Sequence, residues 1–473
     1  MKKGKKNKSI FKKYLCIFIG ILSLIVALLV YFINIFPLEY FIIFIVLIFI
    51  INFIVIFLLL SKGTFKNIFG GFLALLLICA MTLGINYGLN TLGFLKSFGF
   101  SEYKTENYSL LVLNSSDIKS IKDLENKSIG YLEYKNDEGL NKAIDKLKKK
   151  IDYKEVVCID IDTLLDKLNK EEISAIIILD ARLDILKEEN TDEYNLLRKI
   201  SSLNVDVKND AINEDVDVTN TSFNVYISGI DTYGSINNVS RSDVNMLITV
   251  NPVAKEILLT NIPRDYYVKL HKNGEYDKLT HAGIYGINES INTLEDLFDT
   301  KINYYVKVNF TTLVDIVDAL DGITVDSLYT FTSQDGYSFV KGSNTLDGKK
   351  ALSFARERKA FSAGDRTRGE NQQRVLTAII NKAISPKIIT NYNSLLSSVK
   401  GKFITNIDDE DIMKLIKMQL KDNSKWNITS ICVNGTDAYE YVYSYNKSKL
   451  YVMKPDYDTV KDAKTKINSV LDN

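Results

Sequence analysis

Three charged residues stand at the ends of predicted strands, where their side chains could meet. Asp231 follows the run FNVYISGI, Asp243 precedes VNMLITV, and Arg264 follows EILLTNI. If these runs pair as neighbouring strands, all three residues lie at one edge of a sheet. Two carboxylates at one rim suit a hard cation such as Mg²⁺, which often bridges to substrate phosphates. The alternative is that both aspartates bond to their own backbones, as turn residues often do.

The stretch FARERKAFSAGDRTRGENQQRV supplies a second group of polar residues. Thr367 and Glu370 match a T-x-x-E capping box, which predicts a helix that starts there. Arg368 would then lie in the first turn, where unpaired backbone amides favour an anion. Spacings of 4, 3 and 4 residues place four side chains on one face of this helix: Arg368, Gln372, Val375 and Ile379.

An arginine and a glutamine on an otherwise apolar, inward face need a polar partner. A pyrophosphate has enough acceptor oxygens to satisfy both. Arg356 and Arg358 lie two residues apart just upstream, and this spacing aligns their side chains only in an extended segment. The alternative for the whole cluster is a solvated basic helix end with exposed ion pairs. The inward placement favours an anion site.

The elements that position these residues predict a mixed sheet covered by helices. An Asn-Pro turn joins NMLITV to EILLTNI, so these runs form an antiparallel hairpin. Helical patterns over 287–298 and 310–320 flank the strand YYVKVN, and the turn Asp321-Gly322 leads into ITVDS. The tail after residue 426 adds strand-like ITSICV and YVM and a helix over 460–471, and these complete the same domain.

Residues 108–182 alternate short strands with amphipathic helices, which predicts a separate small α/β unit. Its order of elements loosely resembles one lobe of an extracytoplasmic solute-binding domain. The segment 208–221 is rich in Asp, Asn and Thr and is the predicted linker. The predicted division is a membrane part (1–100), an accessory domain (101–207), this linker and a catalytic domain (222–473).

Three apolar runs, Tyr14 to Phe36, Tyr40 to Leu60 and Ile68 to Leu95, each reach the length of about 20 residues that a membrane-spanning helix needs. Seven lysines precede the first run, and Lys62 and Lys66 separate the second from the third. Basic segments stay in the cytoplasm, so three crossings place the rest of the chain outside the cell. The prediction is a multi-pass protein of the cell membrane with extracytoplasmic C-terminal domains.

The composition narrows the chemistry of the predicted site. With 59 basic and 58 acidic residues the net charge is +1, which predicts no nucleic-acid partner. The chain has only two histidines and four widely spaced cysteines, so serine–histidine hydrolysis, zinc catalysis and a disulfide are not expected. Catalysis would have to use carboxylates and guanidinium groups.

From Phe223 onward the chain resembles the LytR-CpsA-Psr family. The resemblance rests on the segments SGIDTYG, RSD, NIPRD, DKLTHAGIYGINESINTLEDLF and ALSFARERKAFSAGDRTRGENQQRV. It implies an α-β-α sandwich with an apolar pocket for a prenyl tail. It also implies an enzyme that uses Mg²⁺, or Mn²⁺ in its place, to move a glycopolymer phosphate from undecaprenyl pyrophosphate to peptidoglycan.

The resemblance also implies roles for individual residues. It assigns Asp231 and Asp243 to the metal, with Arg241 of the RSD segment beside them. It assigns the pyrophosphate to a set of basic and polar residues: Arg241, Arg264, Lys278, Arg356, Arg358, Arg368 and Gln372. It implies that the catalytic residues are Asp231, Arg264, Arg356 and Arg368. Many members carry a further arginine where this chain has Asn371.

Two other functions remain open at this point. The same metal and arginines could direct water at a lipid-linked pyrophosphate, which would make the chain a pyrophosphatase. The solute-binding look of residues 108–182 is also compatible with an envelope sensor or regulator that binds a ligand without turnover. The sequence selects neither the polymer, whether capsule, teichoic acid or another glycan, nor the general base.

Overall fold

The computed structural model describes residues 2–34, 36–95, 103–132, 137–208, 216–230, 236–385, 401–422 and 424–472. They fall into two compact units. The described helices of the first unit are α1 (Lys2–Ile33), α2 (Leu38–Leu60), α3 (Thr64–Leu95) and α14 (Asp409–Asp422). The remaining described elements belong to the second unit, which carries the candidate site.

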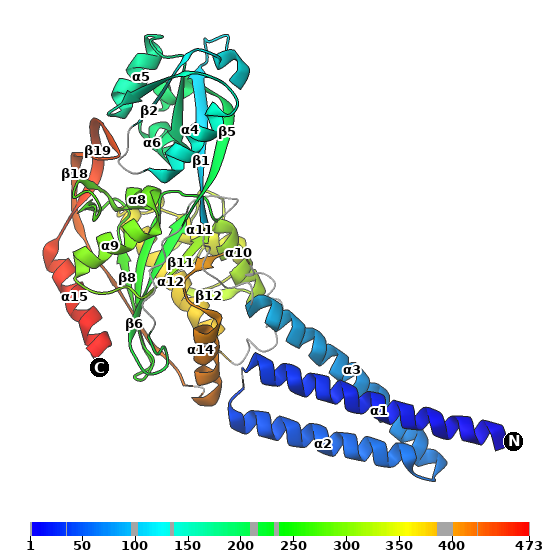
Figure 1. Ribbon diagram of the computed structural model, residues 1–473. Helices are drawn as coiled ribbons and strands as arrows, with labels where there is room; N and C mark the ends of the chain where they lie inside the picture. The colour runs from blue at the N-terminus through cyan, green and yellow to red at the C-terminus, as the bar shows by residue number, and fades with distance from the viewer. Residues whose placement is uncertain are drawn as a thin grey trace. The chain divides into compact units, whose positions relative to one another are not determined.

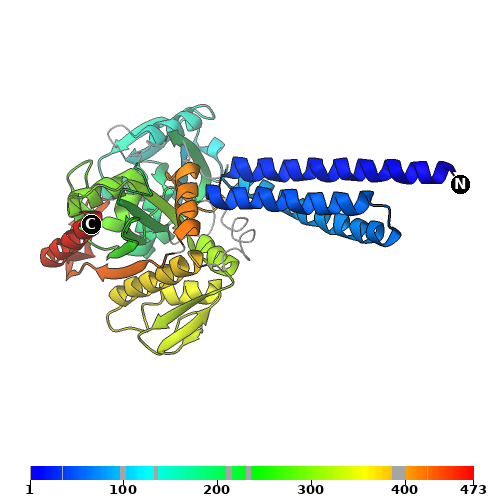
Figure 2. The ribbon, with the colours of Figure 1, turned by 90° about the horizontal axis from the view of Figure 1, so that it is seen from below.

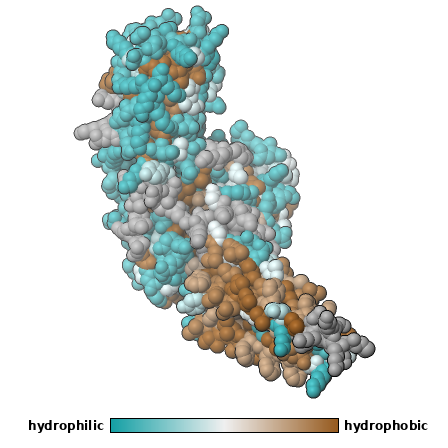
Figure 3. Space-filling model, turned by 45° about the vertical axis from the view of Figure 1, so that its right-hand side comes forward, coloured by the Kyte–Doolittle hydropathy of each residue, from teal (hydrophilic) through white to brown (hydrophobic). Residues whose placement is uncertain are grey.

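The helices α1, α2 and α3 are long and apolar enough to cross a membrane, over Ile10–Ile33, Leu38–Leu60 and Thr64–Gly93. They confirm the helices predicted from the three apolar runs. Many of their large apolar side chains are exposed, and Figure 3 shows the resulting hydrophobic surface in brown. Between the helices, Asn52 donates to the hydroxyl of Ser23 at 2.8 Å, the kind of polar contact that links helices in lipid.

A six-stranded mixed sheet organises the second unit (Figure 1), with the strand order β16-β11-β6-β7-β8-β17. The strands β6, β7 and β8 are antiparallel neighbours, whereas β11 runs parallel to β6 and β17 runs parallel to β8. The predicted hairpin is therefore confirmed. The bounds are β6 (Phe223–Ile230), β7 (Val244–Asn251), β8 (Glu256–Ile262), β11 (Tyr304–Asn309), β16 (Ile404–Thr405) and β17 (Asn427–Cys432).

Alternating side chains give this sheet two different faces. Tyr226 and Leu247 pack into a core with the helices α9 (Ile287–Phe298) and α15 (Tyr457–Asp472). Their neighbours Ile227 and Met246 face the other side and line a pocket. The helices on that side are α10 (Phe310–Ala319), α11 (Gly348–Arg356) and α12 (Asp365–Ala383). This is the predicted α-β-α sandwich with a mixed sheet.

Short strands lie outside the six-stranded sheet, on both sides of the sandwich. In Figure 2, α12 lies beside the yellow strands that follow the Asp321-Gly322 turn, and it packs against β12. The turn has φ values of 59° at Asp321 and 74° at Gly322, which suits a glycine at the second position. The short strands are β9 (Tyr267–Lys269), β10 (Tyr276–Lys278), β12 (Ile323–Ser327), β13 (Phe331–Thr332), β14 (Ser338–Phe339) and β15 (Gly342–Leu346), and a short helix α8 (Leu279–Ala282) follows β10.

Residues 103–208, called the accessory region here, form a second sheet with the order β3-β2-β4-β1-β5. The predicted strands and helices of this region are confirmed. The sequence analysis did not identify β5, which pairs with β1 along its whole length. The bounds are β1 (Tyr103–Leu113), β2 (Ser128–Leu132), α4 (Glu138–Lys148), β3 (Lys154–Cys158), α5 (Ile161–Asn169), β4 (Ala175–Leu179), α6 (Asp180–Glu189), α7 (Thr191–Asn195) and β5 (Leu197–Lys208).

A C-terminal hairpin joins the accessory region to the rest of the second unit. Its strands are β18 (Gly435–Val442) and β19 (Tyr445–Pro455). Val442, Leu450 and Val452 are buried in the same core cluster as Leu164 of α5 and Ile176 of β4. The accessory region therefore shares a core with the chain's C-terminal part. The predicted domain boundaries stay predictions, and residues 209–215 of the predicted linker lie outside the described residues.

Candidate active site

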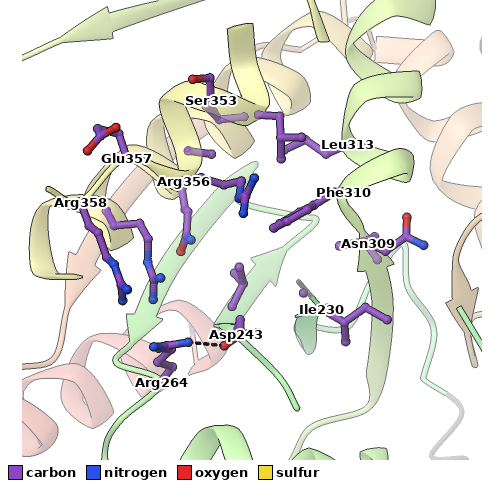
Figure 4. A pocket seen from close by; sticks show the side chains of 18 of the residues that line it. Ile230, Asp243, Arg264, Asn309, Phe310, Leu313, Ser353, Arg356, Glu357 and Arg358 are labelled. Atoms are coloured by element: carbon purple, nitrogen blue, oxygen red, sulfur yellow. Dashed lines mark hydrogen bonds and ion pairs between the residues drawn. The ribbon is translucent and has the colours of Figure 1, made fainter. Parts of the chain in front are cut away.

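A pocket of about 510 Å³ lies between the sheet and the helices α10, α11 and α12. In Figure 4, Arg264 and Arg358 lie on one side of it, and Phe310, Leu313 and Ile230 lie on the other. The helix α12 adds further apolar lining with Val375, Leu376 and Ile379. A cavity that is polar at one side and apolar at the other suits a ligand that joins a charged group to a hydrocarbon chain.

Positive charge exceeds negative charge in the described lining of this pocket. Six cationic side chains line it: Arg241, Arg264, Arg356, Arg358, Lys359 and Arg368. Four carboxylates accompany them: Glu188, Asp243, Asp335 and Glu357. Such an excess of guanidinium groups is suited to a phosphate or pyrophosphate, whose oxygens accept paired hydrogen bonds from arginine.

Arg264 and Asp243 form the central contact. Nη1 of Arg264 donates to Oδ1 of Asp243 at 2.6 Å, and its Nε lies 3.5 Å from Oδ2 of Asp265. Burial alone would lower the pKa of Arg264, but the carboxylates of Asp243 and Asp265 raise it, so the guanidinium stays charged. The predicted meeting of Asp243 and Arg264 is confirmed. Asp231 lies outside the described residues, although its predecessor Ile230 lines the pocket.

Glu188 is a pocket residue that the sequence analysis missed. It comes from α6 of the accessory region and forms an ion pair with Nη1 of Arg241, while its Oε1 lies 3.6 Å from Nη2 of Arg264. Burial alone would raise the pKa of Glu188, but Arg241 and then Arg264 lower it. Burial would likewise lower the pKa of Arg241, and the charge of Glu188 raises it. The accessory region thus supplies one carboxylate to the pocket.

Arg368 lies in the first turn of α12, but the predicted capping box is wrong. The helix begins at Asp365, after a turn in which Gly364 has a φ of 50°, so Thr367 is already inside the helix. The amide of Arg368 therefore donates to Gly364 O at 3.2 Å instead of facing an anion. The side chain of Arg368, rather than its backbone amide, lines the pocket.

The guanidinium of Arg368 is 12% exposed, and its Nη2 lies 2.5 Å from Oδ1 of Asp365. Burial lowers its pKa, and Asp365 partly offsets that effect. Its Nε is buried without a hydrogen-bond partner in the described part of the chain. A buried donor with no acceptor is costly, and a ligand oxygen could satisfy it.

The inward face predicted for α12 is confirmed, since Arg368, Gln372, Val375 and Ile379 all line the pocket. The neighbouring Gln373 points elsewhere: its Nε2 donates to Leu259 O at 3.0 Å and to Ile431 O at 2.6 Å. It ties α12 to β8 and β17. Asn371 is buried outside the pocket lining, and its Oδ1 accepts from Arg374 at 3.2 Å.

Arg356 and Arg358 both line the pocket, as the two-residue spacing predicted. The helix α11 ends at Arg356, and Glu357 between them is extended, with φ −66° and ψ 129°. The carboxylate of Glu357 accepts from the amides of Gln334 at 2.7 Å and Ala360 at 2.9 Å, which holds the loop. Cζ of Arg356 lies 4.2 Å from the centre of the Phe310 ring, a cation–π contact at the junction of the polar and apolar walls.

Lys278 lies behind the pocket, outside its lining. Only 6% of the residue is exposed, and its Nζ lies 3.1 Å from Oε1 of Glu189 and 3.7 Å from Oδ1 of Asp265. Asp265 also contacts Arg264, so Lys278 supports that arginine through a shared carboxylate. Its assignment as a direct pyrophosphate contact stays a prediction, and the structure places it outside the lining of this pocket.

The two histidines are placed away from the pocket lining. His281 is buried, and its Nδ1 lies 2.7 Å from Oδ1 of Asp277 and 2.7 Å from Oγ of Ser444. In a catalytic triad the carboxylate contacts Nδ1 of the histidine and the serine hydroxyl contacts Nε2. Here both Asp277 and Ser444 contact Nδ1, so this group is not arranged as a triad. The group Asp277, His281 and Ser444 instead fixes the turn between β18 and β19.

The donor chemistry of the pocket is compatible with Mg²⁺. Among the described residues no group of three or more His, Cys, Asp or Glu side chains converges as a metal site. Asp243 lines the pocket with carboxylate oxygens, the ligand type that Mg²⁺ prefers. Asp231, the other assigned ligand, lies outside the described residues. Assignment of Mg²⁺ to this pair therefore stays a prediction.

Comparison with known proteins identifies the family of this chain. Residues 190–464 match the LytR_cpsA_psr family over more than half of the chain. The chain is a member of the LytR_cpsA_psr family, as the sequence resemblance predicted. The match begins upstream of Phe223, at the end of α6.

Two curated relatives carry the name polyisoprenyl-teichoic acid–peptidoglycan teichoic acid transferase TagU. The protein from Bacillus licheniformis is 35% identical over 238 residues, which are 50% of this chain and 77% of the relative. The protein from Bacillus subtilis is 38% identical over 186 residues, 39% of this chain and 60% of the relative. The crystal structure of B. subtilis TagV is 27% identical with a TM-score of 0.46, over 53% of this chain and 98% of that one.

Proposed function

We propose that this protein is a membrane-anchored transferase that moves a phosphate-linked glycopolymer from an undecaprenyl pyrophosphate carrier to peptidoglycan. The observation that carries the proposal is one cavity in which an arginine cluster meets an apolar wall. That cavity suits a pyrophosphate joined to a prenyl chain. The names of the TagU relatives support the same reaction, and the apolar helices α1 to α3 would hold the site near the lipid.

In the proposed reaction, an oxygen of the acceptor hydroxyl attacks the phosphorus that carries the glycopolymer. A new P–O bond forms, the P–O bond to undecaprenyl phosphate breaks, and the hydroxyl proton passes to a pocket carboxylate. Arg264 and Arg368 stabilise the charge on the phosphate oxygens, and Arg356 and Arg358 hold the pyrophosphate at the pocket mouth. Mg²⁺, when bound by Asp231 and Asp243, would neutralise further charge.

The test uses the full chain in detergent micelles with a prenyl-pyrophosphoryl oligosaccharide, Mg²⁺ and peptidoglycan fragments. Arg368→Ala removes a buried guanidinium from the pocket and should reduce transfer by about 10²-fold or more. Arg374→Ala is the matched control, because Arg374 lies on the same helix, pairs with Glu370 at 3.4 Å and is outside the pocket lining. Wild-type transfer by a folded Arg368→Ala variant would remove the arginine pocket from the proposal.

Two further measurements separate the competing functions. Release of undecaprenyl phosphate that is equally fast with and without acceptor would indicate a pyrophosphatase, because water would then be the acceptor. Ligand binding without any release would indicate a sensor. Chelation of divalent cations should stop transfer, and added Mg²⁺ or Mn²⁺ should restore it, because the proposed metal offsets pyrophosphate charge.

A further inference from the structure

A second and larger cavity, called the interdomain cleft here, lies between the accessory region and the segment from α8 to α9. Its volume is about 1020 Å³, and all of its lining belongs to the second compact unit. Its lysine, arginine and acidic lining residues are equal in number: the cations are Lys104, Arg182, Lys208 and Lys272, and the carboxylates are Glu106, Asp137, Glu138 and Glu289. Apart from Val207 and Lys208, the lining on the accessory side precedes residue 190 and lies outside the range that matches the family.

The topology of the accessory sheet places this cleft where α/β sheets bind ligands. The strands β3, β2 and β4 are parallel neighbours in that order. The connection from β2 leads to β3 on one side of β2, and the connection from β3 then crosses β2 to reach β4 on its other side. The boundary between β2 and β4 is therefore a topological switch point, and ligands bind outside the carboxyl ends of strands at such points. The residues that end these strands, Leu132 and Leu179, both line the cleft.

Buried polar groups stand on the accessory wall of the cleft. Tyr108 Oη lies 2.9 Å from Oε2 of Glu106 and 3.2 Å from Oδ1 of Asp137, and its one hydrogen is shared between these two carboxylates. Lys104 Nζ lies 2.8 Å from Oε1 of Glu106. A side chain on Gly139 would come within 1.8 Å of Glu106 Oε2, so the glycine makes room for this carboxylate. The wall presents desolvated groups of both signs.

Tyrosine rings stand on the opposite side, and Arg182 of the accessory wall contacts them. Arg182 of α6 is 6% exposed, its Nη2 donates to Tyr285 Oη at 3.2 Å, and its Cζ lies 5.3 Å from the centre of that ring. The ring centre of Tyr443 lies 6.1 Å from that of Tyr285. Tyrosine faces of this kind can pack against a sugar or a peptide side chain.

We propose that the interdomain cleft binds the peptide-bearing part of the peptidoglycan acceptor, an inference that rests on the proposed transferase function. The buried charges of the cleft have both signs, with Glu106 and Glu289 as well as Arg182, so a ligand of one sign would be repelled by part of the lining. A ligand that carries both signs can pair with each. A peptide stem carries ammonium and carboxylate groups together, and its attached sugars would meet the tyrosines.

The cleft is also placed to deliver an acceptor to the pocket. The helix α6 lines both cavities, with Arg182 in the cleft and Glu188 in the pocket. Six residues of helix separate them, which is roughly 9 Å along the axis. A ligand of several sugar and amino-acid units that fills the cleft can therefore extend a hydroxyl toward the phosphorus.

The test measures binding of a disaccharide–tetrapeptide fragment of peptidoglycan to the full chain in detergent micelles by calorimetry. Asp137→Asn removes a charge but keeps a residue that caps α4 well, so the fold should survive. Arg182→Gln probes the contact between the accessory wall and Tyr285. Each variant should weaken binding about tenfold and raise the acceptor KM by a similar factor, with kcat and donor KM unchanged.

Control variants keep this test separate from that of the proposed function. Glu155→Gln alters an accessory-region carboxylate outside the cleft, paired with Tyr131 at 2.6 Å, and should change nothing. Arg368→Ala should lose transfer but keep fragment binding. Unchanged fragment binding in both Asp137→Asn and Arg182→Gln would overturn the cleft proposal even if transfer is confirmed. Equal binding of a glycan without peptide would also overturn it, because the paired charges would then play no part.

Discussion

The pocket and the interdomain cleft differ in the balance of charged residues in their linings. The pocket is smaller, at about 510 Å³, and its described lining has six cations against four carboxylates. The cleft, at about 1020 Å³, balances four of each among its lysine, arginine and acidic residues. An excess of cations selects an anion such as pyrophosphate, whereas a balanced set disfavours any ligand of one sign. The two cavities thus differ in the ligands they can hold although they share α6.

Among the variants that test this difference between the two cavities, Arg264→Lys should cause the largest loss of activity. The substitution keeps the positive charge but loses the planar fork that contacts Asp243 and faces Asp265. If the pocket grips pyrophosphate through paired hydrogen bonds, kcat should fall about 10²-fold with the fold intact. Initial rates of undecaprenyl phosphate release would measure this change.

The matched control is the same arginine-to-lysine substitution in the cleft. Arg182→Lys should leave kcat at saturating acceptor unchanged, because this arginine contacts Tyr285 rather than the pocket. Near-normal kcat for Arg264→Lys would mean that positive charge alone suffices in the pocket. The contrast between a geometric anion site and a balanced cleft would then lose its basis.

Glu188→Gln tests the residue that links the two cavities and should have an intermediate effect. Glu188 and Glu189 end α6, where negative charge opposes the helix dipole, so they depend on Arg241 and Lys278 across the interface. Loss of the Glu188 charge should leave Arg241 less firmly placed and raise the donor KM about three- to tenfold. Steady-state kinetics at varied donor concentration would show the change.

Glu193→Gln is a suitable control for that variant, since Glu193 pairs with Lys447 and lines neither cavity. Glu188→Asp keeps the charge and should recover part of the donor affinity. A lower donor KM in Glu188→Gln would reverse the interpretation, because Glu188 would then compete with pyrophosphate for Arg241 instead of positioning it.

The sequence predicted those parts of the site that depend on local patterns. Strand alternation and a tight turn placed Asp243 beside Arg264, and helical spacing placed Gln372 with Arg368. Contacts between distant segments were not predictable in this way. Glu188 reaches the pocket only because the accessory region packs against the main sheet, and its one local signal was an acidic pair at the end of a helix, the wrong sign for that position.

Local rules also failed where two of them competed. Thr367 and Glu370 fit a capping box, yet the turn at Gly364 let the helix start two residues earlier, at Asp365. Lys278 belonged to a motif of the family, but the fold buried it against Glu189 and Asp265. In both cases the local motif was present, and the surrounding structure decided the role of its residues.

The smallest expected effects are those of substitutions at two adjacent glutamines, Gln372 and Gln373, which have different roles. Gln373→Leu removes the donor that reaches Leu259 O and Ile431 O, and should lower the free energy of unfolding by about 1–3 kcal/mol. Transfer per folded molecule should not change, because Gln373 is outside the pocket lining. Gln372→Leu should show the reverse, a raised donor KM with stability nearly unchanged. Thermal unfolding and kinetics on both variants test this division. Equal losses of stability in the two variants would contradict it, because α12 would then not separate an anchoring face from a ligand-binding face.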